Sequence, residues 1–145
     1  MNSTISNLIP ENKTAIICFK GNASEIYARK YYGHCNIYAI NSSEHAIEQL
    51  LCDVDFSRYE YVIGIGQYSG RDRDKVRIEQ TCSAQFRNKN RGAQRIPIPY
   101  FLKPDDQMKL ADGIGNSYCN LLSYKIVTNF PDIKYTFLHI PVTLV

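Results

Sequence analysis

The sequence predicts an α/β fold in which a mostly parallel, open sheet is covered by helices. Short apolar runs alternate along the chain with segments of helical periodicity, which is the pattern of repeated strand–helix units. The chain has 145 residues, of which 44% are hydrophobic and 21% charged, as in ordinary globular domains. Disordered and fibrous classes are thereby excluded, and we expect one domain over residues 1–145, with a polar lead-in at 1–13.

The first strand, helix and second strand are predicted before residue 41. The continuous apolar run at 14–19 is typical of a strand that is covered on both faces. Ser24 is a suitable N-cap for the helix that follows, and Gly33 is a suitable stop. A second apolar run at 36–40 predicts the second strand.

A second helix and two further strands are predicted in the middle of the chain. Asn41 and Glu44 resemble a capping box, and apolar residues follow them at helical spacing. The run at 61–65 predicts a third strand, which enters a glycine-bearing turn at 66–70. Strict alternation at 75–79 predicts a strand with one covered and one open face.

The last part of the chain predicts a loop, an edge segment, a helix and a final strand. Residues 86–95 are polar and basic, as in a loop, and 96–99 form an extended or edge segment because proline cannot donate to a central ladder. A helix is expected to begin near Ser117 and to end before Pro131. The apolar run at 135–140 predicts the last strand.

The glycines that follow the third predicted strand resemble a dinucleotide-binding fingerprint only superficially. Ser69 occupies the third glycine position, and the next segment alternates like a strand instead of opening a helix. Phosphate binding by this motif needs a helix N-terminus. We therefore interpret the segment as a tight strand exit that requires glycine flexibility, and we expect no cofactor. No cysteine pair has the two-residue separation of zinc sites, so no metal is expected either.

Charge and cysteine usage point to a cytoplasmic protein without a membrane or nucleic-acid partner. The 17 Lys and Arg residues exceed the 14 Asp and Glu residues by 3, which is too small a surplus to indicate such a partner. No apolar run approaches the roughly 18 residues of a membrane span. Five cysteines cannot all pair internally, and the polar opening lacks a signal-peptide pattern. A reducing environment is therefore predicted.

Cys119 is the cysteine with a reactive setting, because it lies just inside the start of a predicted helix. Asn116 or Ser117 is the expected cap there. The unpaired amides and the helix dipole lower a thiol pKa from its usual value of about 8.5, and the thiolate is the nucleophilic form. The alternative is a small packed thiol, and this interpretation is kept for the other four cysteines, Cys18, Cys35, Cys52 and Cys82.

A nucleophilic cysteine needs a base and a group that orients the base. His139 lies near the end of the last predicted strand, where catalytic groups gather in open α/β sheets. Glu79 ends the alternating strand on its polar face and, taken alone, is an ordinary exposed carboxylate. His34 and His45 are predicted to be solvated. The spacing of the residues does not by itself bring Cys119 to the other two.

Four segments resemble, in this order, the motifs of one enzyme family. They are GIGQYSGR at 64–71, IE at 78–79, YCNLLSY at 118–124 and FLHIP at 137–141. With the matching piece at 39–50, the chain resembles a shortened member of the pyrrolidone-carboxylate peptidases (pyroglutamyl peptidase I), cysteine peptidases that remove N-terminal pyroglutamate. The resemblance covers roughly residues 14–141 and implies a three-layer αβα, phosphorylase/hydrolase-like domain.

The resemblance also implies the roles of individual residues. Cys119 would be the nucleophile, His139 the general base and then acid, and Glu79 the carboxylate that orients the imidazole. The implied partner is an N-terminally blocked peptide substrate, without cofactor or metal, and the resemblance leads us to expect self-association into a homo-oligomer. Three further positions match substrate-binding residues of the family: Phe19, Gln67 and Arg71.

Two other hypotheses remain open. Gly21 and Asn22 occupy the positions of a proline and a phenylalanine in the family's early motif, so one wall of the ring-binding slot is incomplete. The chain is therefore either a peptidase of pyroglutamyl or related acyl specificity, or a catalytically impaired relative that acts as a binding or assembly module. The third hypothesis is a nucleic-acid binder, and it depends on the basic loop residues Arg87, Lys89, Arg91 and Arg95.

Overall fold

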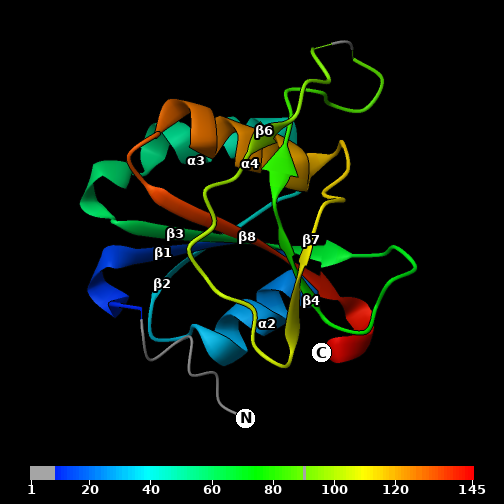
Figure 1. Cartoon of the computed structure of the whole chain (residues 1–145). Helices are drawn as coiled ribbons and strands as arrows, with labels where there is room; N and C mark the ends of the chain where they lie inside the picture. The colour runs from blue at the N-terminus through cyan, green and yellow to red at the C-terminus, as the bar shows by residue number, and fades with distance from the viewer. Residues whose placement is uncertain (1–8, 90) are drawn as a thin grey trace.

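The computed structural model describes residues 9–89 and 91–145 and confirms the α/β prediction (Figure 1). The main strands are β1 (Thr14–Phe19), β2 (Asn36–Ile40), β3 (Tyr61–Tyr68), β4 (Val76–Glu79), β7 (Met108–Ala111) and β8 (Lys134–Pro141). They form one sheet in the order β2-β1-β3-β8-β4-β7. Pairing is parallel throughout except between β8 and β4, which run antiparallel. The sheet is therefore mostly parallel, with one reversal of direction.

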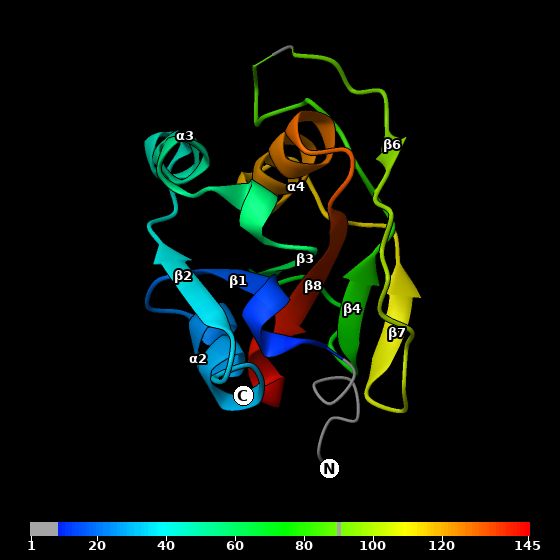
Figure 2. The same cartoon turned by 90° about the vertical axis from the view of Figure 1, so that its left-hand side faces the viewer.

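Helices cover both faces of this sheet, which confirms the three-layer αβα arrangement. One face is covered by α2 (Ala23–Tyr31), and the other by α3 (Glu44–Asp53) and α4 (Tyr118–Asn129), as Figures 1 and 2 show. No helix in the described parts of the chain combines the length and apolar content needed to cross a membrane. The remaining elements are a two-stranded ribbon of β5 (Thr81–Cys82) and β6 (Ile96–Pro97) and short 3-10 helices at Glu11–Lys13, Phe56–Arg58 and Val142–Leu144.

The sheet separates two hydrophobic cores. On the side of α3 and α4, Ile17 of β1 packs in one cluster with Phe137 of β8. On the side of α2, Ile16 packs in a second cluster with Leu138. Successive residues of a strand point to opposite faces, so a strand between two cores must be apolar on both. This explains the continuous apolar run of β1, in which all six residues are buried.

The two helix caps predicted from the sequence are each wrong by two residues. Asn22, not Ser24, caps α2, and its side chain accepts a hydrogen bond from the backbone N–H of Ser24. The Ser24 hydroxyl is buried and accepts instead from the N–H of Phe19. Ser43, not Asn41, caps α3, and its hydroxyl accepts a hydrogen bond from the backbone N–H of Ala46. In both cases the competing side chain stood within the same short polar segment, so composition did not distinguish between them.

The predicted open face of β4 is also wrong. All four residues of β4 are buried, and its polar face is covered because Arg77 stacks over Tyr68 and Glu79 contacts His139 and the N–H of Gly113. The short strand β7 was not predicted, since its polar and apolar residues give no clear pattern over four positions. The alternation of β4 was therefore interpreted as a strand with one face open to solvent. The edge pairing of 96–99 is confirmed in part, as β6 pairs with β5 outside the main sheet.

Strand β3 continues to Tyr68 and so includes the first three residues of the segment 66–70 that was predicted to be a glycine turn. Gly64 and Gly66 lie within the strand, and neither has the positive φ that requires glycine. Space is the reason for both. A Cβ at Gly64 would overlap the hydroxyl of Tyr135, and a Cβ at Gly66 would overlap Sγ of Cys119. The predicted role in backbone flexibility is therefore replaced by close packing of β3 against α4 and β8.

The cap of α3 can be tested by replacing the two candidate residues separately. We expect Ser43→Ala to lower the free energy of unfolding by about 1 kcal/mol, because the N–H of Ala46 loses its acceptor. Asn41→Ala, the matched control, should change it by less than about 0.5 kcal/mol. Urea unfolding measures both, and equal losses for the two variants would contradict the assignment of the cap.

Candidate active site

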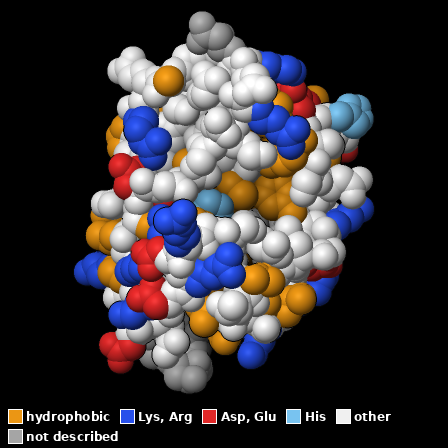
Figure 3. Space-filling model, turned by 90° about the vertical axis from the view of Figure 1, so that its right-hand side faces the viewer, with side chains coloured by type: hydrophobic (Ala, Val, Ile, Leu, Met, Phe, Trp, Pro, Cys, Tyr) orange, Lys and Arg blue, Asp and Glu red, His pale blue; other side chains and the backbone are white. Residues whose placement is uncertain are grey.

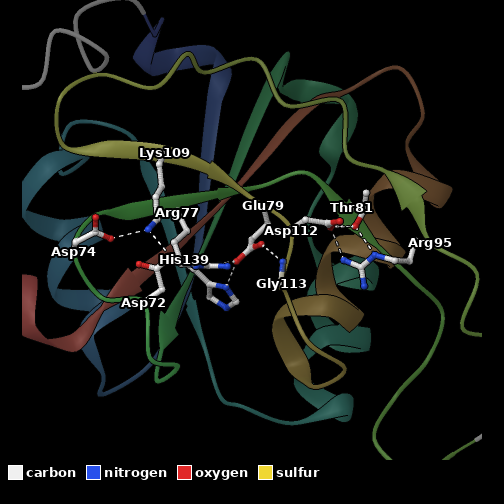
Figure 4. A network of polar contacts seen from close by, with 10 residues as sticks. All are labelled: Asp72, Asp74, Arg77, Glu79, Thr81, Arg95, Lys109, Asp112, Gly113 and His139. Atoms are coloured by element: carbon white, nitrogen blue, oxygen red, sulfur yellow. Dashed lines mark hydrogen bonds and ion pairs between the residues drawn. The ribbon is translucent and has the colours of Figure 1, made fainter.

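Strands β4 and β8 bring Glu79 and His139 together. The antiparallel register pairs Arg77 with His139, and Glu79 lies two residues further along the same face of β4. Diagonal neighbours in a sheet are within reach of long side chains. Oε2 of Glu79 lies 2.7 Å from Nδ1 of His139, and Oε1 accepts a hydrogen bond of 2.8 Å from the backbone N–H of Gly113 (Figure 4). The carboxylate thus joins the imidazole to the backbone of the segment that leads to α4.

Glu79 stays ionised although it is completely buried. Burial alone raises the pKa of a carboxyl group, because the charge loses its hydration. This effect is outweighed by the hydrogen bonds to His139 and Gly113 and by the positive charge of Arg77, so the pKa of Glu79 lies below its usual value. The site therefore holds a fixed negative charge next to the imidazole.

Cys119 lies above Gly66 on the same face of the sheet. It is the second residue of α4 and is half-buried. Gly66 is the register partner of His139 in the parallel pair of β3 and β8, and side chains at partner positions point to the same face. Because a Cβ at Gly66 would overlap Sγ, the sulfur occupies the space next to the imidazole position. No hydrogen bond joins thiol and imidazole among those of the described residues.

The expected lowering of the Cys119 pKa is wrong in sign. Burial and the nearby charge of Glu79 raise the pKa of the thiol to about 12, while its own backbone N–H at the helix start acts in the opposite direction. A helix start contributes only about half an elementary charge, and loss of hydration outweighs it here. Cys119 therefore carries a neutral thiol at rest, and its ionisation would require a base.

Three of the other cysteines behave as packed thiols. Burial raises the pKa of Cys18 and Cys35 to about 11 and that of Cys82 to about 12. Cys52 lies exposed on α3, and all five cysteines are free thiols. The described residues contain no cluster of three side chains that could hold a metal ion.

Asn120 ties the cysteine helix to the segment after β5. The side chain of Asn120 is fully buried, and its Oδ1 accepts from the N–H of Ser83 at 2.8 Å. Its Nδ2 donates to the carbonyl oxygens of Ser83 and Gln85 at 3.0 and 2.8 Å. Since Asn120 follows Cys119 directly, these bonds hold the backbone of the candidate nucleophile in place. The sequence analysis did not identify this residue, although a polar side chain among Leu121 and Leu122 was a signal.

The three predicted substrate-binding residues have different surroundings. Phe19 ends β1 and is buried in the core that also contacts Cys119, so it lies on the same side of the sheet as the thiol. The side-chain carbonyl of Gln67 accepts from the N–H of Ala23, which ties it to the start of α2 on the other side. Arg71 is exposed in the loop after β3. Of the three residues, only Phe19 belongs to the core cluster against which Cys119 packs.

Arg77 and Tyr68 belong to the site and were not identified from the sequence. Arg77 donates from Nε to Oε2 of Glu79 at 3.3 Å, and its guanidinium lies over the ring of Tyr68, 4.3 Å from the centroid. The ring of Tyr68 lies 5.4 Å from that of His139. The two-residue spacing of Arg77 and Glu79, which puts opposite charges on one strand face, was the available signal. Figure 3 shows the corresponding face of the molecule, with a recessed histidine beside a hydrophobic hollow and basic side chains around it.

Two neighbouring carboxylates contact three of the four cations of the basic loop. Lys89 and Arg91 both contact Glu44, at 3.6 and 2.7 Å, and Arg95 contacts Asp112 at 2.6 Å. The guanidinium of Arg87 stacks over the ring of Tyr118 at the start of α4. The two carboxylates offset two of the four positive charges on which the nucleic-acid hypothesis depends.

Solved structures of pyroglutamyl peptidases are similar to this chain. Pyroglutamyl peptidase I from Bacillus amyloliquefaciens matches with a TM-score of 0.59 and 16% identity, over 91% of this chain and 81% of that one. Pyrrolidone carboxyl peptidase from Thermus thermophilus matches with a TM-score of 0.65 and 15% identity, over 88% and 84%. The enzyme from Thermococcus litoralis matches with a TM-score of 0.59 and 16% identity, over 90% and 76%. The chain has the pyroglutamyl peptidase fold. No family model and no curated protein sequence matches it.

Within this pyroglutamyl peptidase fold, the contact between Gly66 and Cys119 can be tested by a double-mutant cycle. Gly66→Ala should lower the free energy of unfolding by about 1–3 kcal/mol, because the new methyl group overlaps Sγ. Adding Cys119→Ala should recover part of this loss, since the Cβ would still lie 2.8 Å from Cζ of Phe137. Chemical unfolding of the four proteins gives the coupling, and strictly additive effects would contradict the contact.

Removal of the Asn120 side chain should destabilise the protein strongly. We expect Asn120→Ala to lower the free energy of unfolding by about 2–4 kcal/mol, because buried backbone groups of Ser83 and Gln85 lose their partners. Asn129→Ala on the exposed part of α4 is the control and should cost less than about 0.5 kcal/mol. A similar, small effect of both substitutions on the midpoint of thermal unfolding would contradict the stabilising role of the Asn120 hydrogen bonds.

Proposed function

We propose that this protein is a cysteine peptidase that hydrolyses an N-terminal pyroglutamyl, or related acyl, amide bond through a thioester intermediate. The observation that carries the proposal is the buried pair of Glu79 and His139 beside the thiol of Cys119. The fold shared with pyroglutamyl peptidases supports the same reaction class. A blocked peptide is the corresponding substrate.

His139 acts as base and acid in turn. The neutral imidazole takes the proton of the Cys119 thiol while Sγ forms a bond to the acyl carbon, and a rotation about the Cα–Cβ bond of Cys119 brings the sulfur to the imidazole. The imidazolium then gives this proton to the leaving amine as the C–N bond breaks. Water attacks the thioester with His139 again as base, which releases the acid and restores the thiol. Glu79 stabilises the imidazolium in both steps.

Transition-state binding is assigned to the start of α4. The backbone N–H groups there point along the helix axis and would stabilise the oxyanion of the tetrahedral intermediate. An uncharged lactam ring would be bound by apolar contacts at the surface of this core, since Phe19 and Phe137 are themselves buried within it. Asn22 serves as the cap of α2, so this position supplies no aromatic wall. This is the reason to include related acyl groups in the proposal.

The test is release of a chromophore from a pyroglutamyl amide. We expect turnover by the wild-type protein, a loss of more than about a thousandfold in Cys119→Ala, and inhibition by thiol alkylation. Cys52→Ala, which removes the exposed thiol on α3, is the matched control and should retain full activity.

Two results would overturn the proposal together. They are the absence of turnover with pyroglutamyl and other N-acyl amides, and the absence of an acyl adduct on Cys119 in mass spectra of the protein incubated with these substrates. The raised pKa of the Cys119 thiol favours the alternative in that case, namely a catalytically impaired relative that binds a partner. Structural integrity of the Cys119→Ala variant is checked by its unfolding midpoint.

A further inference from the structure

Behind the pair of Glu79 and His139 lies a buried cation. Arg77 is only 7% exposed. Because arginine is rarely buried without a partner, its contacts indicate what stabilises the charge. Its Nε contacts Oε2 of Glu79 at 3.3 Å, and the same oxygen lies 2.7 Å from Nδ1 of His139 (Figure 4). One carboxylate oxygen is therefore shared between a permanent cation and the imidazole.

The guanidinium of Arg77 is held from several sides. Nη1 lies 3.4 Å from Oδ2 of Asp72, and the group stacks over the ring of Tyr68. A Cβ at Gly113 would lie 3.0 Å from Nη2, so the glycine leaves room for it. Lys109 of β7 contacts Asp72 and binds Asp74 at 2.7 Å, and it thereby holds Asp72 in place at the surface. Contacts with Glu79, Tyr68 and Asp72 thus determine the position of the guanidinium.

We propose that Arg77 is a positioning residue whose guanidinium keeps Glu79 ionised and turned toward the imidazole of His139. The inference rests on the proposed function, in which His139 must accept the proton of Cys119. A buried carboxylate without a fixed cation would lose charge or direction more easily.

The charges that face the thiol and the imidazole are few among the described residues. Glu79 and Arg77 come from β4, Tyr68 from β3 and Cys119 from α4, and Asp72 reaches Arg77 from the loop before β4. Removal of a positive charge raises the pKa of neighbouring acids, and removal of a negative charge lowers it. Substitutions of Arg77 and Asp72 should consequently have opposite signs, which a packing role alone would not produce.

The experiment follows the pH dependence of Cys119 alkylation by iodoacetamide, with the labelled peptide quantified by mass spectrometry. Arg77→Met should move the midpoint to higher pH by about one unit. Asp72→Asn should move it to lower pH by a few tenths, since Asp72 is half exposed and screened. Arg77→Lys keeps the charge and should stay within about 0.3 units of the wild type. Arg29→Met, which removes an exposed arginine on α2, should cause no shift.

The inference is wrong if Arg77→Met changes only the unfolding midpoint and leaves the alkylation midpoint where it is. If that variant does not fold, the opposite displacement by Asp72→Asn decides, and an unchanged midpoint there overturns the inference as well. Alkylation requires no turnover, so the two proposals fail separately. A shift without hydrolysis of any acyl amide supports the role of Arg77 and contradicts the peptidase, whereas hydrolysis without a shift does the reverse.

Discussion

The site depends on one interaction, the ionised carboxylate of Glu79 in a position that solvent does not reach. A buried charge is stable only when its lone pairs meet donors, and here the donors come from three places in the chain. They are His139 of β8, the backbone of Gly113 after β7, and Arg77 of β4 itself. The same group therefore fixes the imidazole, the segment that leads to the cysteine helix and the one antiparallel junction of the sheet.

The sequence predicted the parts of the fold in which a single local pattern is strong. The apolar run of β1 and the start of α4 after Asn116 and Ser117 are such cases, and both lie where they were expected. Strand β7 has four residues of mixed character, so its pairing with β4 depends on tertiary contacts that no local pattern records. Because β7 and the segment after it were not predicted, the polar face of β4 was expected to be open to solvent. The burial of Arg77 was therefore not recognised.

The candidate triad was predicted from a family resemblance rather than from spacing. Glu79 and His139 are sixty positions apart and meet because β4 runs against β8, a direction that the residues alone do not reveal. The start of α4 does favour the thiolate of Cys119, as expected, but this is only one of several contributions to the pKa of the thiol. Burial of the sulfur against β3 is the larger one, and it could be recognised only with Gly66 in place beneath the thiol.

The protonated state of Cys119 has a consequence for its redox chemistry. Peroxides and disulfides react with thiolates, and a thiol that keeps its proton at neutral pH is attacked slowly. A nucleophile that loses its proton only to a neighbouring imidazole during the reaction is thus shielded from oxidants between turnovers. The exposed Cys52 on α3 would be oxidised before Cys119, so oxidants would modify a surface thiol before the candidate nucleophile.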